Sequence, residues 1–171
     1  MNAHPNIRLR TFHVNDADEI YQLLADGRVS HTTATIPFPY NLHQAQAWLH
    51  TLLEQQSATC KRRVLAIECL DDKTLIGVVS VQDIAHRVGN VAYWVGASHW
   101  GKGVATEVLR LAVTQEWLSE FDVFIGKHLT SNPASGIVLK RNAFVLVGTE
   151  MLDWRDVGLQ ELQVYELKNA T

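Results

Sequence analysis

The most regular pattern of apolar and polar residues in this chain lies between Val91 and Leu118. An apolar run, Val91–Val95, is followed by a short stretch that contains three glycines. From Val104 onward, apolar side chains recur every three or four residues, and polar or charged side chains occupy the other positions. A short apolar run is typical of a strand and the longer period is typical of a helix. This stretch therefore predicts a strand, a glycine turn and a helix.

The remaining patterns predict one α+β domain over the whole chain (1–171). Helices are expected after Asn15 and Asn41, which are good N-cap residues, and after Asn132, which precedes a proline. Ser30–Tyr40 has two prolines and no period, so it is expected to be a loop. Strands are expected at Ile7–Thr11, Val64–Leu70, Leu75–Val81, Asn90–Val95, Phe121–Lys127, Phe144–Glu150 and Glu161–Leu167.

The glycine turn predicts an anion-binding site. Such a turn leaves unpaired N–H groups at a helix N-terminus, where the helix dipole favours a phosphate or pyrophosphate. Two nucleotide motifs fit it poorly. A P-loop needs a Ser or Thr where Gly103 stands, and the Rossmann fingerprint needs its third glycine at Thr106. An ordinary tight turn between strand and helix is the remaining alternative.

A third motif fits the turn and its surroundings. The run Trp100-Gly101-Lys102-Gly103-Val104-Ala105-Thr106-Glu107, preceded by Tyr93-Trp94-Val95-Gly96, resembles the acetyl-CoA pyrophosphate loop of the GNAT N-acetyltransferases. Downstream, Asn132-Pro133-Ala134-Ser135 resembles the Asn-x-x-Ser segment of that family. Upstream, Ile36–Tyr40 is similar to the substrate-side segment of the branch that contains the ribosomal-protein N-terminal acetyltransferases RimJ and RimL. The resemblance is specific for fold and cofactor, and less so for substrate.

The resemblance implies a GNAT fold, a mostly antiparallel mixed sheet splayed between its fourth and fifth strands, with helices on both faces. Acetyl-CoA would enter this gap as co-substrate, with its thioester side on the backbone N–H groups of Trp94 and Val95. Its pantetheine arm would lie beside Asn132, and the hydroxyl of Ser135 would act as general acid. An N-cap at Asn132 with Ser135 in the first helical turn is the structural alternative. The pyrophosphate would lie on the loop formed by Gly101, Lys102, Gly103, Val104, Ala105 and Thr106.

The implied activity is transfer of an acetyl group to a primary amine by direct attack in a ternary complex. No covalent enzyme intermediate is required, because holding the two reactants together supplies much of the acceleration. The expected acceptor is a protein or peptide N-terminal α-amine, for example that of a ribosomal protein. Other possibilities are a small-molecule amine acetyltransferase, a CoA-binding module that has lost catalysis, and, more remotely, a P-loop NTPase.

The chain departs from the family pattern where a general base is expected. Related members carry Glu-x-Gly-Tyr-Trp on the fourth strand, whereas this chain reads Asn90-Val91-Ala92-Tyr93-Trp94. An amide cannot act as a base. Asp83 and Glu68, on neighbouring expected strands, are therefore the candidates, ahead of His31 and His86. The alternative for each acid is a solvated residue at the end or on the face of a strand.

Composition narrows the classes of partner. A formal net charge of −3 without a basic run argues against nucleic-acid binding. No run is long and apolar enough for a membrane span, and no signal sequence is visible, so a cytoplasmic location is expected. The two cysteines, Cys60 and Cys69, and the histidine spacings predict reduced thiols and no metal site. Edge strands near the C-terminus leave a homodimer possible.

Overall fold

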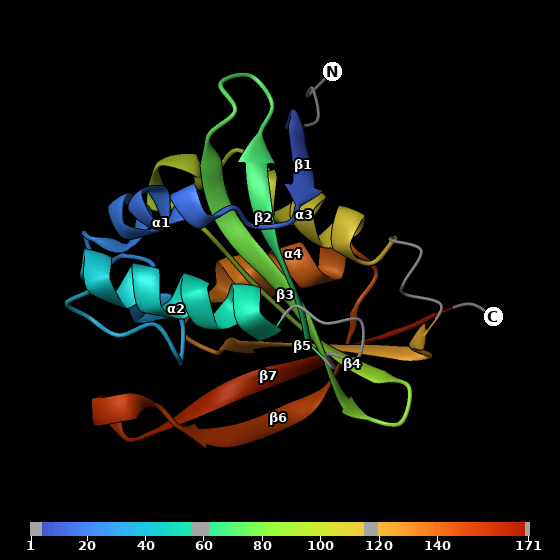
Figure 1. Cartoon of the computed structure of the whole chain (residues 1–171). Coiled ribbons are helices and arrows are strands. Elements are labelled where there is room, and N and C mark those ends of the chain that lie inside the picture. Colours follow the sequence, from blue (N-terminus) through green and yellow to red (C-terminus); the bar gives the residue numbers. More distant parts are fainter. Residues whose placement is uncertain (1–4, 56–61, 115–119, 170–171) are drawn as a thin grey trace.

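The computed structural model describes residues 5–55, 62–114 and 120–169 (Figure 1). Its strands are β1 (Ile7–Arg10), β2 (Arg62–Cys69), β3 (Leu75–Ala85), β4 (Val88–Val95), β5 (Val123–Leu129), β6 (Val145–Asp153) and β7 (Leu159–Lys168). Its α-helices are α1 (Ala17–Leu24), α2 (Leu42–Gln55), α3 (Val104–Ala112) and α4 (Pro133–Arg141). Short 3₁₀ turns are η1 (Val14–Asp16), η2 (Ser30–Thr32), η3 (Ala97–His99) and η5 (Arg155–Val157). The part of the expected central helix at 115–119 lies outside the described residues.

The strands form one sheet in the order β1-β2-β3-β4-β5-β7-β6. Neighbouring strands are antiparallel except β4 and β5, which are parallel. Figure 1 shows α1 and α2 on one face of the sheet and α3 and α4 on the other. The structure confirms the expected α+β architecture, a mixed and mostly antiparallel sheet with helices on both faces.

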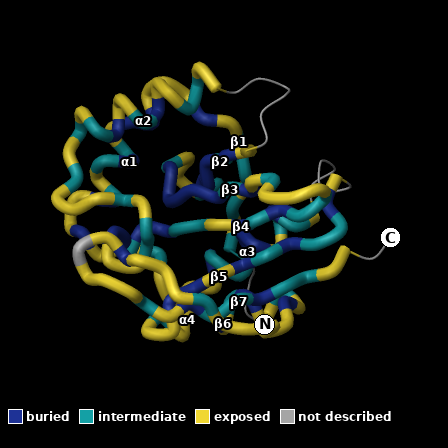
Figure 2. The backbone as a smooth tube through the Cα atoms, turned by 90° about the horizontal axis from the view of Figure 1, so that it is seen from below, coloured by how far each residue is buried: buried dark blue, intermediate teal, exposed yellow. Residues whose placement is uncertain are grey.

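Each face of the sheet has its own apolar core. The core under α1 and α2 contains Ile20, Leu24, Ala45, Leu49, Ala66 and Val78, among others. The core under α3 and α4 contains Ile67, Val79, Val108, Leu109, Phe124, Leu139 and Tyr165, among others. Because side chains alternate along a strand, adjacent residues of β4 contact different cores. Tyr93 packs against the α3–α4 core and Trp94 against the α1–α2 core. Figure 2 shows the contrast between the buried central strands β2 and β3 and the exposed strand β6.

The parallel strands β4 and β5 separate partway along their length. They pair from Val88 opposite Val123 to Val91 opposite Gly126. Beyond that point β4 continues beside β3 up to Val95, and β5 continues beside β7 up to Leu129. The segment of β4 after Val91 therefore has no strand on its β5 side. This confirms the expected splay between the fourth and fifth strands.

Two of the three expected helix caps, at α1 and α2, differ in outcome. At α2 the prediction is confirmed, because Gln44 N–H donates to Asn41 Oδ1 and Asn41 N–H donates to Gln44 Oε1, each at 2.9 Å. At α1 the prediction of Asn15 is wrong. Asn15 is exposed within η1, and the buried Asp16 instead accepts the backbone N–H of His13 at 2.7 Å. Asp16 stands at the N-cap position of α1 but makes no capping hydrogen bond from its side chain, and its carboxylate is paired with Arg10, a contact that local sequence does not reveal.

Candidate active site

The open edge of β4 is defined by the direction of its backbone groups. Gly96 N–H donates to Ile76 O on β3 at 2.8 Å. Backbone groups along an antiparallel strand face its two sides alternately, so those of Trp94 also face β3. Those of Tyr93 and Val95 face the gap. The carbonyl of Val95 accepts the indole N–H of Trp100 at 2.7 Å, so the exposed Trp100 lies at the Val95 end of this edge.

The glycine loop has the backbone conformation of an anion-binding turn. Gly101 and Gly103 have φ angles of 73° and 78°, in the left-handed region that favours glycine. Gly103 is the N-cap residue of α3, and its carbonyl accepts the N–H of Glu107 at 3.1 Å. The first-turn N–H groups of residues 104–106 have no intrahelical acceptor. No heavy atom lies within 4 Å of a Cβ built at Gly101, so the loop is open on this side.

Charge in the loop is concentrated on Lys102. Lys102 is exposed, between the two left-handed glycines. Burial, followed by the charge of Lys102, lowers the pKa of His99, although Asp72 acts in the opposite direction. His99 is therefore neutral at physiological pH. An anion bound on the loop would be stabilised both by the charge of Lys102 and by the N–H groups at the N-terminus of α3.

Ser135 lies close to Tyr93, a residue that the sequence did not assign to catalysis. Their hydroxyl oxygens are 3.2 Å apart, and either can be the donor. Burial raises the pKa of Tyr93 to about 12, although the hydrogen bond with Ser135 acts in the opposite direction. Tyr93 thus keeps its proton throughout the working pH range. The position of Tyr93 beside Trp94 in the family motif was the only indication in the sequence. The motif does not predict that Tyr93 pairs with Ser135, which is 42 positions away.

Asn132 precedes the same helix. It stands at the N-cap position of α4, with Pro133 at the first helical position, but its side chain makes no capping hydrogen bond. Its backbone carbonyl accepts the N–H of Ser135 at 3.3 Å. The half-buried amide of Asn132 is thus not used in capping, which was the structural alternative for this residue. At the other end of the helix, Asn142 donates from Nδ2 to Thr106 O at 3.1 Å and so ties α4 to α3.

The structure separates both candidate carboxylate bases from the gap. Glu68 lies opposite Arg8 at the far edge of the sheet and is ion-paired with Arg8 and Arg10. Hydrogen bonds from Arg8 and Arg10 outweigh its burial and lower the pKa of Glu68, which makes it a weaker base. Asp83 lies opposite Gly89, near the β3–β4 turn and at the other end of β4 from the gap. Neither residue lies beside the open segment of β4, so the structure lends no support to either as the base.

Asn90 lies on the same face of the sheet as Trp94. In the register its neighbours are Gln82 on β3 and Ile125 on β5, and the next residue in this row is Glu166 on β7. The nearest carboxylate on that side of Asn90 in this row is thus Glu166, which lies on β7, the strand beyond Ile125 of β5. Of the two histidines, His86 lies in the β3–β4 turn, while His31 lies in η2 with its ring 5.8 Å from that of Phe38.

The described residues offer neither a metal site nor a membrane-spanning helix. No group of three or more His, Cys, Asp or Glu side chains is arranged there to hold a metal ion. Cys69 is a free, half-buried thiol, and Cys60 lies outside the described residues. Among the described helices, none has the length and apolar character needed to cross a bilayer.

Comparison with known proteins decides between the possible families. Residues 6–145 match the family model described as an acetyltransferase (GNAT) domain, which covers more than half of the chain. The chain belongs to the GNAT acetyltransferase family. As a GNAT enzyme it is an N-acetyltransferase with acetyl-CoA as acetyl donor. A sequence comparison with curated proteins gives no match.

Solved structures share the same GNAT fold at low sequence identity. The Microcin C7 self-immunity acetyltransferase MccE, in complex with acetyl-CoA and AMP, is 22% identical with a TM-score of 0.82, covering 96% of this chain and 93% of its own. RimL, a ribosomal L7/L12 α-N-protein acetyltransferase in complex with CoA, is 18% identical with a TM-score of 0.79, covering 95% and 94%. A spermidine N-acetyltransferase from Vibrio cholerae, in complex with CoA and spermine, is 18% identical with a TM-score of 0.77, covering 95% of each chain.

Proposed function

We propose that this GNAT enzyme acetylates the N-terminal α-amine of a protein or peptide, such as a ribosomal protein, by direct attack on acetyl-CoA. The observation that carries the proposal is Asn90, an amide at the position where the family pattern has a carboxylate. Its neighbours in the sheet, Gln82 and Ile125, are not bases either. An amine that is largely neutral at physiological pH does not need a strong base, and an α-amine has this property.

We propose that acetyl-CoA binds along the gap and the glycine loop. The pyrophosphate is assigned to the N–H groups from Gly101 to Thr106, with Lys102 as the nearby cation. The pantetheine arm is assigned to the side of Asn132, whose amide is not used in capping. On β4 the thioester side is assigned to the N–H groups of Val95 and Tyr93. Tyr93 replaces Trp94 in this assignment, because the backbone groups of Trp94 face β3.

Gly103→Val is expected to weaken acetyl-CoA binding at least tenfold, which is about 1.4 kcal/mol. The nearest atom to a Cβ at Gly103 is Pro5 Cγ at 3.9 Å, so the protein itself has room for a side chain. The expected loss comes from the φ of 78°, which valine disfavours, and from the new side chain beside the anion. Calorimetric titration with acetyl-CoA measures it.

Gly158→Val is the matched control for this measurement. Gly158 also has a positive φ, 84°, and open space around it, but it lies between β6 and β7. This variant should bind acetyl-CoA like the unsubstituted protein. If the unsubstituted protein, Gly103→Val and Gly158→Val bind acetyl-CoA with equal affinity, the assignment of the pyrophosphate to this loop is wrong.

The choice of acceptor follows from the free energy of deprotonation. The reference pKa of an α-amine is about 7.7 to 8.0, against about 10.4 for a lysine side chain. Near pH 7.5 about a third of the α-amine is neutral, compared with about one lysine side chain in a thousand. Deprotonating lysine thus costs about 3.5 kcal/mol more, which is comparable to the contribution of one general base. A site with Asn90 in place of the carboxylate therefore favours the α-amine.

The expected result is a higher kcat/KM at pH 7.5 for a peptide with a free N-terminus than for the same peptide with a blocked N-terminus and one lysine. The difference should narrow toward pH 9, where more of the lysine is neutral. Spermidine serves as the small-molecule comparison. Faster reaction of the lysine peptide or of spermidine at pH 7.5 would contradict the preference. Glu166, the next carboxylate in the row of Asn90, would then be the base to substitute.

A second copy of the chain is the proposed partner of β6. This strand is at the edge of the sheet, where its backbone groups are open to pairing. Antiparallel pairing of two copies centred on Thr149 would place Leu146 opposite Leu152 and Val147 opposite Met151, so the edge is complementary to itself. Its exposed apolar residues are Val145, Leu146, Val147, Met151 and Leu152.

Light scattering on the purified protein is expected to give the mass of a dimer. Leu152→Glu should give the monomer mass, because it places a charged side chain opposite the apolar Leu146 of the other copy. If the unsubstituted protein has the mass of a monomer at tens of micromolar, the proposed dimer through β6 is wrong.

A further inference from the structure

Arg155 joins two segments that are far apart in the sequence. It lies in η5, between β6 and β7, and its guanidinium donates to the backbone carbonyls of Ser30, Thr33 and Ile36. The acceptors belong to the loop between α1 and α2, at least 119 positions away. One side chain therefore ties the β6–β7 connection to that loop at three points.

An apolar contact reinforces this junction. The neighbouring residue Trp154 is buried in a small core with Leu129 of β5 and Leu162 of β7. Ala34, from the loop between α1 and α2, packs against the same core. The loop is thus anchored to the C-terminal half of the sheet by Trp154 as well as by Arg155.

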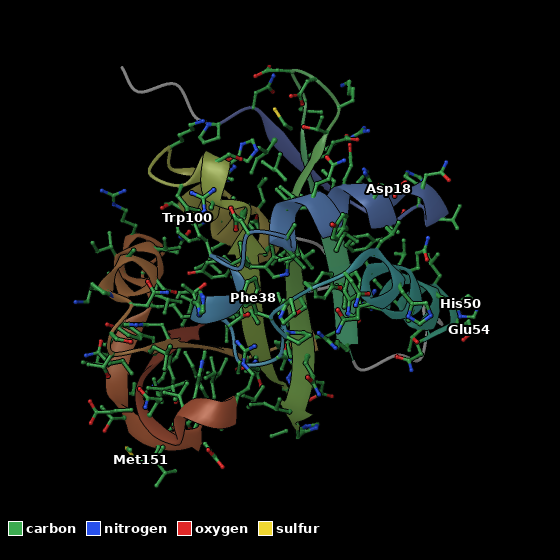
Figure 3. All side chains as sticks on the ribbon, turned by 90° about the vertical axis from the view of Figure 1, so that its left-hand side faces the viewer. Asp18, Phe38, His50, Glu54, Trp100 and Met151 are labelled. Atoms are coloured by element: carbon green, nitrogen blue, oxygen red, sulfur yellow. The ribbon has the colours of Figure 1, made fainter. Side chains whose placement is uncertain are left out.

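The anchored loop shares an apolar core with Trp94 of β4. Ile36 and Tyr40 pack in the α1–α2 core, the core that also holds Trp94. Within the loop, Ser30 Oγ donates to Pro37 O at 3.1 Å. In the view of Figure 3, Phe38 of this loop lies below Trp100 of the glycine loop and above Met151 of β6, to the right of both. The loop thus packs in the core of Trp94 and is also bonded to Arg155 of the β6–β7 connection.

The backbone of Arg155 is in an uncommon conformation. Its φ is 47°, in the left-handed region, which a non-glycine residue adopts at a cost of about 1 kcal/mol or more. The three hydrogen bonds offset this cost. A guanidinium is a planar fork with five donors, whereas a lysine ammonium is a point charge on a flexible stem. The geometry thus calls for arginine specifically.

We infer that Arg155 is a specificity-determining positioning residue, which sets the width of the acceptor entrance between the 30–40 loop and the β6–β7 connection. The inference rests on the proposed function in one respect, that the acceptor amine enters on the α1–α2 side of the gap. With Arg155 in place, the loop is held close and a slender chain bearing an amine is favoured. Without it, the loop moves away and bulkier amines gain relative to slender ones.

The test compares Arg155→Ala and Arg155→Lys with the control Arg87→Ala. Arg87 is also an arginine at positive φ, 59°, and it also bridges two segments, through Asp122 at 2.7 Å. It lies in the β3–β4 turn, at the other end of β4 from the gap. The readouts are hydrogen exchange of the 30–36 amides in the free protein, acetyl-CoA affinity, and kcat/KM for a slender and a bulky amine.

In both Arg155 variants, exchange at 30–36 should rise at least fivefold, and the ratio of kcat/KM between the two amines should change at least tenfold. Acetyl-CoA affinity should stay within twofold, and Arg87→Ala should change neither the exchange nor the ratio. The inference is wrong if the Arg155 variants leave the kcat/KM ratio between the two amines unchanged, or if they leave hydrogen exchange at 30–36 unchanged. It is also wrong if Arg155→Lys keeps both the ratio and the exchange of the unsubstituted protein. Because exchange is measured without turnover, failure of α-amine peptides to react would count against the proposed function alone.

Discussion

Ser135→Ala is expected to lower kcat at least about a hundredfold while the affinity for acetyl-CoA stays within about twofold. One general acid contributes about 10² to 10⁴ to a rate, and the departing thiolate of CoA needs a proton. In the proposed site the hydroxyl of Ser135 donates that proton as the carbon–sulfur bond breaks and the new carbon–nitrogen bond forms. The attacking nitrogen loses one proton to solvent as the amide forms, and one proton from solvent restores the serine hydroxyl. The hydroxyl of Tyr93, 3.2 Å away, can then donate a hydrogen bond to the serine oxygen. Pre-steady-state kinetics together with calorimetry separate the chemical step from binding.

Two further variants sharpen this prediction. Tyr93→Phe should lower kcat less than Ser135→Ala, and the double variant should resemble Ser135→Ala alone, because the two hydroxyls act as one unit. Ser131→Ala is the matched control, since Ser131 is exposed in the turn before α4. With a Tyr93 pKa of about 12, no loss of rate through its ionisation is expected between pH 7 and 9. Weaker acetyl-CoA binding with an unchanged kcat in Ser135→Ala would make the serine a binding contact.

Arg10→Ala is expected to lower the free energy of unfolding by about 3 to 5 kcal/mol at pH 7. The guanidinium bridges Asp16 at 2.8 Å and Glu68 at 3.0 Å, and the side chains of the three residues are 12%, 7% and 7% exposed. Its removal leaves two buried carboxylates without this partner, and that penalty exceeds the net value of the bridge itself. Urea unfolding measures the change.

Arg8→Ala is the control on the same strand. Arg8 also pairs with Glu68, but its side chain is 54% exposed, so the expected loss is at most about 1 kcal/mol. A loss in Arg10→Ala no larger than that in Arg8→Ala would show that the buried network adds little to stability.

The effect of Arg10→Ala should depend on pH in a definite direction. At Asp16, burial favours the neutral form, but hydrogen bonds from Arg10 and from the N–H of His13 outweigh it and lower the pKa. At Glu68, the bonds from Arg8 and Arg10 likewise lower the pKa. A carboxylate with a lowered pKa contributes stability above its unfolded value of about 4 and loses it as pH falls through the folded value. The difference between Arg10→Ala and the unsubstituted protein should therefore shrink on acidification below about pH 4.

The parts of the fold that follow from local pattern could be predicted from sequence. The period of α3 and the reciprocal cap between Asn41 and Gln44 depend on residues close together in the chain. The left-handed glycines of the loop follow from their motif for the same reason. Asn15 is not the N-cap residue of α1, because Asp16 stands at that position and is held by a tertiary contact with Arg10 of β1.

The parts of the site that depend on register could not be predicted. Which neighbour Asp83 faces depends on its pairing opposite Gly89, and a register shift follows between Asp83 and Ala85. Glu68 likewise lies beside a register shift and meets two arginines of β1 that no spacing indicates. Contacts between distant segments were also hidden from sequence. The pairing of Tyr93 with Ser135 is an example, because hydrophobic period reports the face of a residue and not its partner across the sheet.

The place of β7 in the sheet has a consequence for how the chain folds during synthesis. β7 comes last among the strands in sequence, yet it lies between β5 and β6. Until it has left the ribosome, β5 keeps an open edge and the apolar strand β6 has no neighbour to pair with. Domains fold as units as they emerge, at about 5 to 20 residues per second, and unpaired strand edges are prone to aggregate. The ten-residue strand β7 thus determines when this half of the sheet can close, and until then the edges of β5 and β6 stay open to pairing with other chains.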